Sequence, residues 1–277
     1  MSFARTITAR TITKSIAMTL VKAVGHRTGI VGGLLLLAVA GCAGPGSASS
    51  AAPEGGLVVV AGATGGTGRA VVRNLVSQGF EVRAFVRDEA KARVVLGDGI
   101  NYAVGDVRDI ATIRTAMQGA GYAISAIGST RSDPTNNPEA VDYGGVKNLA
   151  DAAAEAGVQQ FVLVSSSGVT QEDHFLNKQF DNILNWKLKG EDALRASGVP
   201  YTIVRPGGLV NTPAGEFAVV FAQGDTTAGR ISREDVALIC IASLKVPAAR
   251  NRTFETYSAD AAGENDWQAL FGGLAAD

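Results

Sequence analysis

A strand-length apolar run that meets a glycine-rich loop constrains this chain more than any other feature. The run is Leu57-Val-Val-Val-Ala61, and a helical pattern begins at Arg69. Between them, Gly62 permits a tight turn, Gly65 lets the backbone approach a pyrophosphate, and Gly68 lets the helix pack on the strand. The first-turn N–H groups of that helix then face the phosphate charge. The sequence therefore predicts a dinucleotide site formed by the loop residues Gly62, Ala63, Thr64, Gly65, Gly66, Thr67 and Gly68.

Strand and helix patterns alternate along the chain beyond residue 56. The expected strands are Leu57–Ala61, Glu81–Val86, Asn101–Val104, Tyr122–Ala126, Phe161–Val164, Tyr201–Val204, Phe217–Phe221 and Arg252–Tyr257. The expected helices are Arg69–Ser77, Lys91–Leu96, Ile110–Met117, Pro138–Ala156, Leu184–Ala196, Arg233–Leu244 and Asn265–Phe271. Strands rich in Val, Ile and Leu without polar alternation are typical of a sheet buried on both faces. The predicted fold class is α/β, a single doubly wound Rossmann-type domain whose parallel sheet is flanked by helices.

The distribution of charge narrows the classes of partner. Residues 1–53 carry five Lys or Arg and no Asp or Glu, which leaves 20 basic and 26 acidic residues in the rest of the 277-residue chain. A mildly acidic body argues against nucleic-acid binding, which needs a basic surface. We therefore expect a small-molecule substrate or none, while the oligomeric state stays open.

The first 41 residues are expected to be a targeting segment. The apolar run 28–41 is too short to span a bilayer comfortably and is typical of a secretory leader. Val39-Ala-Gly-Cys42 is similar to the lipobox of bacterial lipoproteins, in which the chain is cut before the Cys and diacylglycerol is attached to it. The favoured prediction is a lipid anchor on Cys42 at a bacterial membrane, outside the cytoplasm. A flexible tether over 42–55 and one domain over 56–277 would follow it.

Two alternatives for the leader stay open. The Thr- and Arg-rich segment before Val31 also resembles a transit peptide of the plastid type, with Ala38-Val-Ala40 as a cleavage site. A start at Met18 would give a leader of more usual length before Cys42. The second cysteine, Cys240, falls in an apolar helical stretch and is expected to be a buried core residue. With two His and no Cys/His cluster, no metal site is predicted.

Four stretches match a known family in order and spacing. They are the loop 62–68, Val104-Gly-Asp-Val-Arg-Asp109, Phe161-Val-Leu-Val-Ser-Ser-Ser167, and Trp186-Lys-Leu-Lys-Gly-Glu191 with Tyr201-Thr-Ile-Val-Arg-Pro-Gly-Gly208. The segment Gly56–Tyr257 thereby resembles the atypical short-chain dehydrogenase/reductase proteins, of the NmrA-like and chloroplast translocon-associated dehydrogenase-like types. The resemblance implies an NAD(P)H-binding oxidoreductase, in a family whose members differ widely in function.

The residue at the end of the second strand determines whether such a site prefers NAD or NADP. NAD-selective sites place a carboxylate there, whereas NADP-selective sites place a cation for the 2′-phosphate. Here the strand runs into Arg87, whose guanidinium can grip a phosphate with two hydrogen bonds. The alternative for Arg87 is a surface pair with Asp88 or Glu89. We expect NADP (NADPH) rather than NAD, with Arg69 adding charge near the same end.

The family also implies the rest of the cofactor site. Asp106 takes the place of the residue that binds the adenine amino group, with Val107 beside it. Ala126, Ile127 and Gly128 would line the ribose on the nicotinamide side.

The catalytic residues depart from the family pattern at one position. Short-chain dehydrogenases usually pair a Tyr with a Lys four residues later, and a Ser on the preceding strand polarises the substrate carbonyl. By register with the family, Ser167 takes the place of the Ser, and Lys187 takes the place of the Lys that also holds the nicotinamide ribose. The position of the Tyr is Ile183, which cannot transfer a proton. The resemblance therefore implies catalytic Ser167 and Lys187 without the usual proton donor.

Three interpretations of Ile183 stay open. In the first, the protein reduces a small carbonyl or enone-type substrate, and Tyr143, His174 or a water supplies the proton. In the second, it binds NADPH without turnover, as a redox sensor, scaffold or assembly factor. In the third, Ser167 and Lys187 are structural residues at the ribose.

Two further expectations concern the end of the chain. The region 207–229, after Pro206, is expected to supply the substrate pocket, with Trp186 and Phe217 as apolar walls. The helix at Asn265–Phe271 is amphipathic, so it either docks on the body or serves a partner.

Overall fold

The computed structural model describes residues 56–130, 133–226 and 228–277. The leader, Cys42 and the tether lie outside these ranges, so the predictions made for them stay predictions. None of the helices within the described ranges is both long and apolar enough to cross a bilayer.

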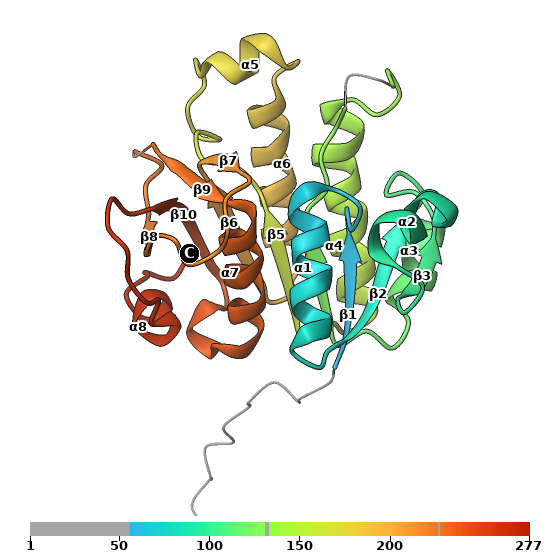
Figure 1. The fold of residues 1–277 in the computed structure, drawn as a ribbon. Helices are drawn as coiled ribbons and strands as arrows, with labels where there is room; N and C mark the ends of the chain where they lie inside the picture. Colours follow the sequence, from blue (N-terminus) through green and yellow to red (C-terminus); the bar gives the residue numbers. More distant parts are fainter. Residues whose placement is uncertain (1–55, 131–132, 227) are drawn as a thin grey trace, which may run out of the picture. The chain divides into compact units, whose positions relative to one another are not determined.

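An eight-stranded sheet in the order β3-β2-β1-β4-β5-β6-β10-β8 forms the centre of the domain (Figure 1). Its strands are β1 (Leu57–Ala61), β2 (Glu81–Val86), β3 (Asn101–Val104), β4 (Tyr122–Ser125), β5 (Gln160–Val164), β6 (Tyr201–Pro206), β8 (Val219–Ala222) and β10 (Arg252–Ser258). Every neighbouring pair is parallel except β10 and β8. The chain reverses direction across the sheet between β1 and β4, and in such folds ligands bind at the carboxyl edge of this switch point. The predicted doubly wound fold is confirmed.

Helices cover both faces of the sheet. They are α1 (Gly66–Ser77), α2 (Glu89–Leu96), α3 (Ile110–Met117), α4 (Val146–Glu155), α5 (Phe175–Gln179), α6 (Ile183–Ala196), α7 (Arg233–Lys245) and α8 (Trp267–Gly272), with a π-helical segment η1 (Glu139–Gly145) and a 3-10 turn η2 (Pro247–Ala249). Helices α1 and α7 pack on one face, and α3, α4 and α6 on the other. The short strands β7 (Gly208–Val210) and β9 (Arg230–Ser232) pair separately.

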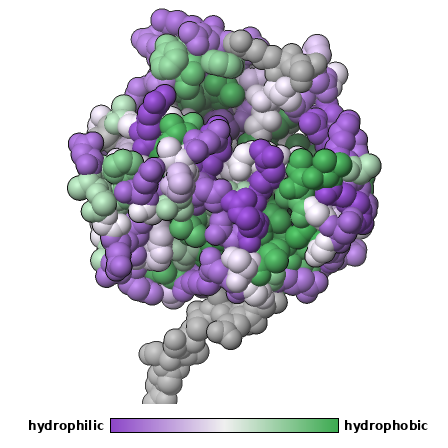
Figure 2. Space-filling view, viewed as in Figure 1, coloured by the Kyte–Doolittle hydropathy of each residue, from purple (hydrophilic) through white to green (hydrophobic). Residues whose placement is uncertain are grey.

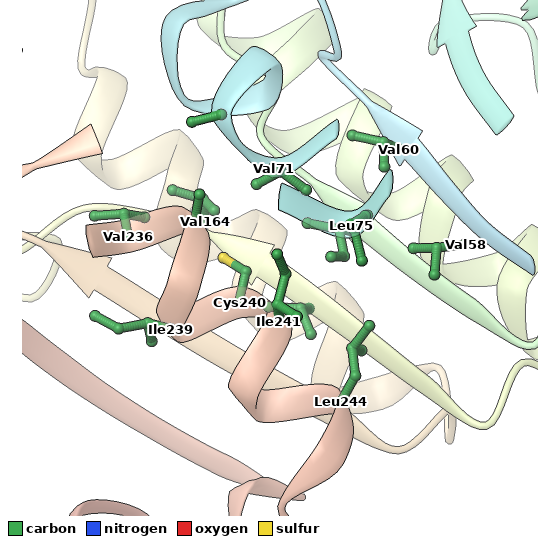
Figure 3. Packing of buried hydrophobic residues seen from close by; sticks show 14 of the residues in the cluster. Val58, Val60, Val71, Leu75, Val164, Val236, Ile239, Cys240, Ile241 and Leu244 are labelled. Carbon is green, nitrogen blue, oxygen red and sulfur yellow. The ribbon is translucent and has the colours of Figure 1, made fainter. Parts of the chain in front are cut away.

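The alternation of side chains along β1 divides the core in two. Val58 and Val60 face α1 and α7, whereas Val59 and Ala61 face the helices on the other side. Figure 3 shows the first layer, where Leu75 of α1 meets the side chains of α7. Cys240 is buried in this layer, and burial raises the pKa of its thiol to about 12. The prediction that Cys240 is a core residue is confirmed.

The end of the chain docks on the body. Phe271 of α8 is fully buried, and its ring centroid lies 5.1 Å from that of Phe221 and 5.7 Å from that of Phe254. The carboxylate side chain of Asp277 accepts hydrogen bonds from Tyr201 and Thr253 of β6 and β10. Of the two alternatives for this helix, the structure shows the first.

Two helices differ from the sequence expectation in a way that matters for the site. Helix α1 begins at Gly66 rather than Arg69, because the glycine loop itself forms the first turn. The expected helix over 138–156 is present, but its first seven residues, Glu139–Gly145, are π-helical, and α4 continues directly from them. The π segment packs closely on α6, where a Cβ on Gly190 would lie 2.4 Å from the carbonyl oxygen of Asp142.

Candidate functional site

The glycine loop can be made only with glycine at two of its positions. Gly62 has a φ of +77°, and a Cβ there would lie 2.5 Å from the carbonyl oxygen of Ala126. A Cβ on Gly68 would lie 2.1 Å from the carbonyl oxygen of Gly62. The N-cap residue Gly65 has no side chain to cap α1, so the N–H groups of the first turn are left for a ligand. This loop fits an anionic group such as a pyrophosphate.

A cavity of about 260 Å³ opens beside this loop, at the carboxyl edge of β1, β2 and β4. Its lining includes the predicted residues Gly62, Thr64, Gly65, Arg87, Asp106, Val107, Ala126, Ile127 and Gly128. Sequence reasoning missed Phe85, Val86, Gly105, Asn136 and Val141, which also line it. Phe85, Val86 and Gly105 adjoin predicted residues, so their places at strand ends could have revealed them. Nothing in the sequence marks the buried Asn136 or Val141.

The remaining predicted cofactor residues lie elsewhere. Ala63, Thr67 and Gly68 are buried beneath the loop and support it. Gly66 and Arg69 line a different cavity on the outer side of α1. Arg69 and Arg87 thus line different cavities.

Arg87 is an exposed cation at the mouth of the cofactor cavity. The carboxylates that sequence analysis offered as its alternative partners are engaged by other side chains. Asp88 pairs with Lys91, with 3.1 Å between the charged atoms, and Glu89 pairs with Arg93 at 2.6 Å. Among the described residues, the Arg87 guanidinium has no hydrogen-bond or ion-pair partner. It is therefore available to an anion that enters the cavity.

Asp106 is held by its neighbour Arg108. The guanidinium of Arg108 donates to both carboxylate oxygens, at 2.8 and 2.6 Å, and its backbone N–H donates to one of them. The hydrogen bonds from Arg108 lower the pKa of Asp106. The carboxylate is thus ionised and fixed in direction, with acceptor capacity left for one further donor such as an adenine amino group.

Lys187 meets a buried carboxylate that the sequence did not single out. Its Nζ lies 2.7 Å from Oδ1 of Asp142 in the π segment, and Asp142 is 1% exposed. The other oxygen, Oδ2, accepts a hydrogen bond from the backbone N–H of Ser129. Lys187 and Asp142 line a small cavity together with Ile127, which also lines the cofactor cavity. The lysine is therefore held by its ion pair with Asp142, next to a residue that also lines the cofactor cavity.

Ser167 lies in a loop after β5 that is held by buried acidic residues. Asp225, 3% exposed, accepts hydrogen bonds from the backbone N–H groups of Gly168 and Thr170, at 2.6 and 2.9 Å. The N–H of Ser167 donates to the carbonyl of Pro206. These bonds fix the backbone on both sides of Ser167 while its side chain stays half-buried.

A buried network of charges joins the two ends of that loop. Ser165 donates to Glu191, and the guanidinium of Arg205 links Glu191 to Glu255 at 2.7 and 3.0 Å. Glu255 in turn accepts the backbone N–H of Asp225. Burial alone would lower the pKa of Arg205, but hydrogen bonds and charge from the two glutamates outweigh it and raise the pKa. Removal of any one member of this network would leave a buried charged group without its partner.

Ile183 lines a separate cavity of about 540 Å³. Its other walls come from the loop between β4 and η1 and from the turn before α6; they are Ser129, Thr130, Asp133, Pro134, Asn137, Pro138, Gln179, Phe180 and Asp181. The cavity adjoins the cofactor cavity, because Gly128 and Asn136 line one while Ser129 and Asn137 line the other. The expected contribution of residues 207–229 is not seen there, since Asn211–Pro213 line the cavity on α1 instead.

The two side chains considered as proton donors are used structurally. Tyr143 stacks on Trp186, with ring centroids 6.1 Å apart. His174 caps α5 by accepting the N–H of Leu176 through Nδ1, and its ring lies beside Gly168. Neither side chain lines the cavity that contains Ile183.

Comparison with known proteins identifies the family. Residues 62–247 match the model of a family described as NAD(P)H-binding. The chain belongs to this family. It is 36% identical to sanguinarine reductase of Eschscholzia californica, in a match covering 77% of this chain and 94% of the relative. It is 35% identical to an uncharacterised chloroplastic protein of Arabidopsis thaliana, covering 77% and 74%. It is 31% identical to the photosystem II assembly factor Ycf39 of Trieres chinensis, covering 71% and 62%.

Solved structures agree on the fold. A candidate NAD-dependent epimerase/dehydratase from Bacillus halodurans superimposes with a TM-score of 0.69 at 25% identity, covering 79% of this chain and all of the other. A triphenylmethane reductase from Citrobacter sp., complexed with NADP(H), gives a TM-score of 0.53 at 20% identity, covering 71% and 68%. The second likeness shows the fold alone. The family thus has an NAD(P)H-binding, oxidoreductase-like character, and its relatives include both a reductase and an assembly factor.

Proposed function

We propose that the protein is an NADPH-dependent reductase that acts on a small substrate in the cavity beside Ile183. The observation that carries the proposal is the position of Arg87 at the mouth of a cavity whose floor is a glycine turn. The uncapped start of α1 suits the pyrophosphate, and the unengaged guanidinium suits a 2′-phosphate, which NADP has and NAD lacks. Bound NADPH would supply a hydride at the end of the cavity nearest Ile127 and Gly128.

Residues of this chain would then orient the cofactor and form a hydrogen bond with the substrate that accepts the hydride. Ser167 lies on a loop fixed by Asp225 and Pro206, and it lines neither the cofactor cavity nor the cavity beside Ile183. We propose that it donates a hydrogen bond to the reacting oxygen of a carbonyl or enone, which requires that the bound substrate extend to this loop. Lys187, held by Asp142, is proposed to bind the nicotinamide ribose. Ile183 adds apolar surface and no proton, so the proton for an oxygen acceptor comes from water in the open cavity.

Ile183 also favours acceptors that need no proton. Addition of a hydride to the carbon of an iminium cation moves the π electron pair onto nitrogen and gives a neutral amine. The described lining of the cavity includes the carboxylates of Asp133 and Asp181. Hydrogen bonds from Thr135 lower the pKa of Asp133, so this carboxylate stays ionised. A cationic acceptor is therefore the better electrostatic match.

The test compares neutral and cationic acceptors, using the natural chain and two variants at Ile183. NADPH oxidation is followed with an aromatic aldehyde, an enone and a small iminium cation, together with sanguinarine because a relative carries its name. We expect the iminium to be reduced fastest by the natural chain. Ile183→Tyr should raise kcat/KM for the aldehyde at least tenfold, because it restores a donor, while Ile183→Phe should not. Equal aldehyde rates in all three proteins, or no turnover with any acceptor, would contradict a reductase of this kind.

A second function is favoured by the same residue. A cofactor site beside a position without a proton donor suits a protein that binds NADPH and changes its contacts with a partner, as a sensor, scaffold or assembly factor. The assembly factor Ycf39 among the relatives supports this alternative. Tight NADPH binding without turnover of any acceptor would favour it.

The relatives also provide information about the subcellular localisation of the protein. The chloroplastic relative supports the plastid-type leader rather than the bacterial lipid anchor. We propose that the segment before the domain is a transit peptide. Import of a fluorescent fusion of residues 1–55 into isolated chloroplasts tests this, and acylation of Cys42 in a bacterial host would contradict it.

A further inference from the structure

A groove on the outer side of α1 is the largest of the cavities described above and belongs to no part of the proposed reaction. It has a volume of about 700 Å³, against 260 Å³ for the cofactor cavity. Its walls are the outward side of α1, the end of α2, the loop after β7 and the start of α7. We call it the α1 groove. The two cavities share no lining residue, although Gly65 lines one and Gly66 the other.

The α1 groove is polar at one end and apolar at the other. Helices α1 and α2 both run from the carboxyl edge of the sheet to its amino edge. Arg69 and Arg233 lie near the start of α1, where a Cβ on Gly66 would meet the side chain of Arg233 at 2.8 Å. Val76 and Val95 lie near the ends of the two helices, at 47% and 44% exposure. Figure 2 shows a hydrophobic surface in this region beside a strip of hydrophilic side chains.

The polar end carries an excess of positive charge on an otherwise acidic domain. Arg73 pairs with Glu234. Arg233 donates to neutral partners, the side-chain oxygen of Asn211 at 2.8 Å and the carbonyl of Leu209 at 3.3 Å. Arg69 has no hydrogen-bond or ion-pair partner among the described residues. Two guanidinium groups at this end therefore have no carboxylate to balance them.

The apolar end is continuous over three elements. Val72 and Val76 come from α1, Val95 and Leu96 from α2, and Ile100 from the turn before β3. Val72 is 2% exposed and forms part of the core, while Val76 and Val95 are open to solvent. Contiguous apolar surface rimmed by polar side chains is typical of a ligand-binding groove.

We propose that the α1 groove binds a free single-chain amphiphile with one carboxylate, such as a medium-chain fatty acid. The carboxylate lies between Arg69 and Arg233, where a guanidinium can donate to both oxygens. The chain extends along α1 towards Val76 and Val95. The volume is within the range of small-ligand sites, and the positive end selects an anion. The N-terminal segment of this chain is a poor occupant, because residues 1–53 are basic.

The test is the binding of dodecanoate to the full chain, by isothermal titration calorimetry in the presence of saturating NADPH. We expect one site with a micromolar dissociation constant. Dodecyltrimethylammonium, which has the same chain and the opposite charge, should bind at least thirtyfold more weakly. The double variant Arg69→Gln/Arg233→Gln should weaken dodecanoate binding at least tenfold, whereas Arg114→Gln, an exposed arginine paired with Glu155, should leave it unchanged.

The apolar end is tested with a matched pair of valines on the surface. Val76→Asp should weaken dodecanoate binding at least tenfold, because it places a negative charge on the path of the chain. Val94→Asp should not, since Val94 is 85% exposed and lies outside the groove. Both variants change exposed side chains, and their melting temperatures verify that they fold.

Several results would overturn the proposal. They are equal affinity for the anionic and cationic amphiphiles, binding that ignores the arginine double variant, and competition between dodecanoate and NADPH, which would place the ligand in the cofactor cavity. A concentration-dependent dimer that Val76→Asp abolishes would also overturn it, because the groove would then be a contact between two copies of the chain.

Discussion

The two halves of the sheet hold their loops by different physical means. Around β1 and β4, the loop is shaped by backbone alone, since Gly62 and Gly68 allow main-chain atoms to approach where no side chain fits. Around β5, β6 and β10, the loop that carries Ser167 is held by Glu191, Arg205, Glu255 and Asp225, all buried. The first half leaves backbone N–H groups at the loop for an anion, whereas the second half fixes the loop of Ser167 through buried charged groups that pair with one another.

The difference predicts that substitutions in the two halves have separable effects. A change in the charge network should unfold or loosen the domain, with little direct effect on the cofactor cavity. A change in the glycine loop should act on cofactor binding as well as on stability.

Arg205→Met should destabilise the domain more than any other substitution considered below. It leaves the buried carboxylates of Glu191 and Glu255 facing each other without their shared partner, which costs about 4 kcal/mol of the free energy of unfolding. Urea denaturation measures this loss in the free energy of unfolding. Arg114→Met is the control, because its exposed pair with Glu155 contributes under about 1 kcal/mol. If the two variants lose the same stability, the network does not hold the second half together.

Gly68→Ala should cost about 3 kcal/mol, since the added methyl overlaps the carbonyl oxygen of Gly62 and the loop must move. NADPH affinity should fall with it, beyond what the remaining folded fraction explains. Gly99→Ala is the matched control, because its Cβ would meet nothing within 4 Å. Calorimetric titration of the folded variants with NADPH measures this affinity. Full NADPH affinity in Gly68→Ala would show that the turn is not the binding surface.

A pH dependence is expected from Tyr201 in the second half. Burial and the hydrogen bond to Asp277 raise the pKa of its hydroxyl from 10.0 to about 12. The protonated form is thus favoured in the folded state, and its contribution is fully present below pH 10 and lost as the pH rises towards 12. We expect the free energy of unfolding to fall by about 2 kcal/mol over this interval. Tyr201→Phe should be less stable at pH 8 and show a flatter profile; an unchanged slope would remove Tyr201 as the cause.

The sequence predicted the first half better than the second, for reasons visible in particular residues. A glycine at a required position leaves a pattern, so the loop, Arg87 and Asp106 could be placed around one cavity before the structure was known. A buried carboxylate looks like any other acidic residue in a sequence. Asp142, Asp225 and Glu255 carried no signal, because their importance depends on partners up to dozens of residues away.

The cavity beside Ile183 shows the same limit. The family register identified residue 183 as the position without a proton donor, but its neighbours come from two loops of irregular backbone. Asp181 and Asn182, directly before α6, both have positive φ angles, of 50° and 58°. Such conformations are set by tertiary packing rather than by local propensity, so the sequence did not predict this cavity.

We propose that Arg87 makes the glycine-loop cavity an NADP(H) site, and paired titrations with the two cofactors test this role. NADPH and NADH are titrated into the natural chain, into Arg87→Ala, and into Arg93→Ala as an arginine control outside the cavity. We predict that the natural chain and the control prefer NADPH at least tenfold, which corresponds to about 1.4 kcal/mol. Arg87→Ala should lose that preference while keeping its affinity for NADH. Equal binding of the two cofactors by the natural chain, or an unchanged preference in Arg87→Ala, would contradict the claim.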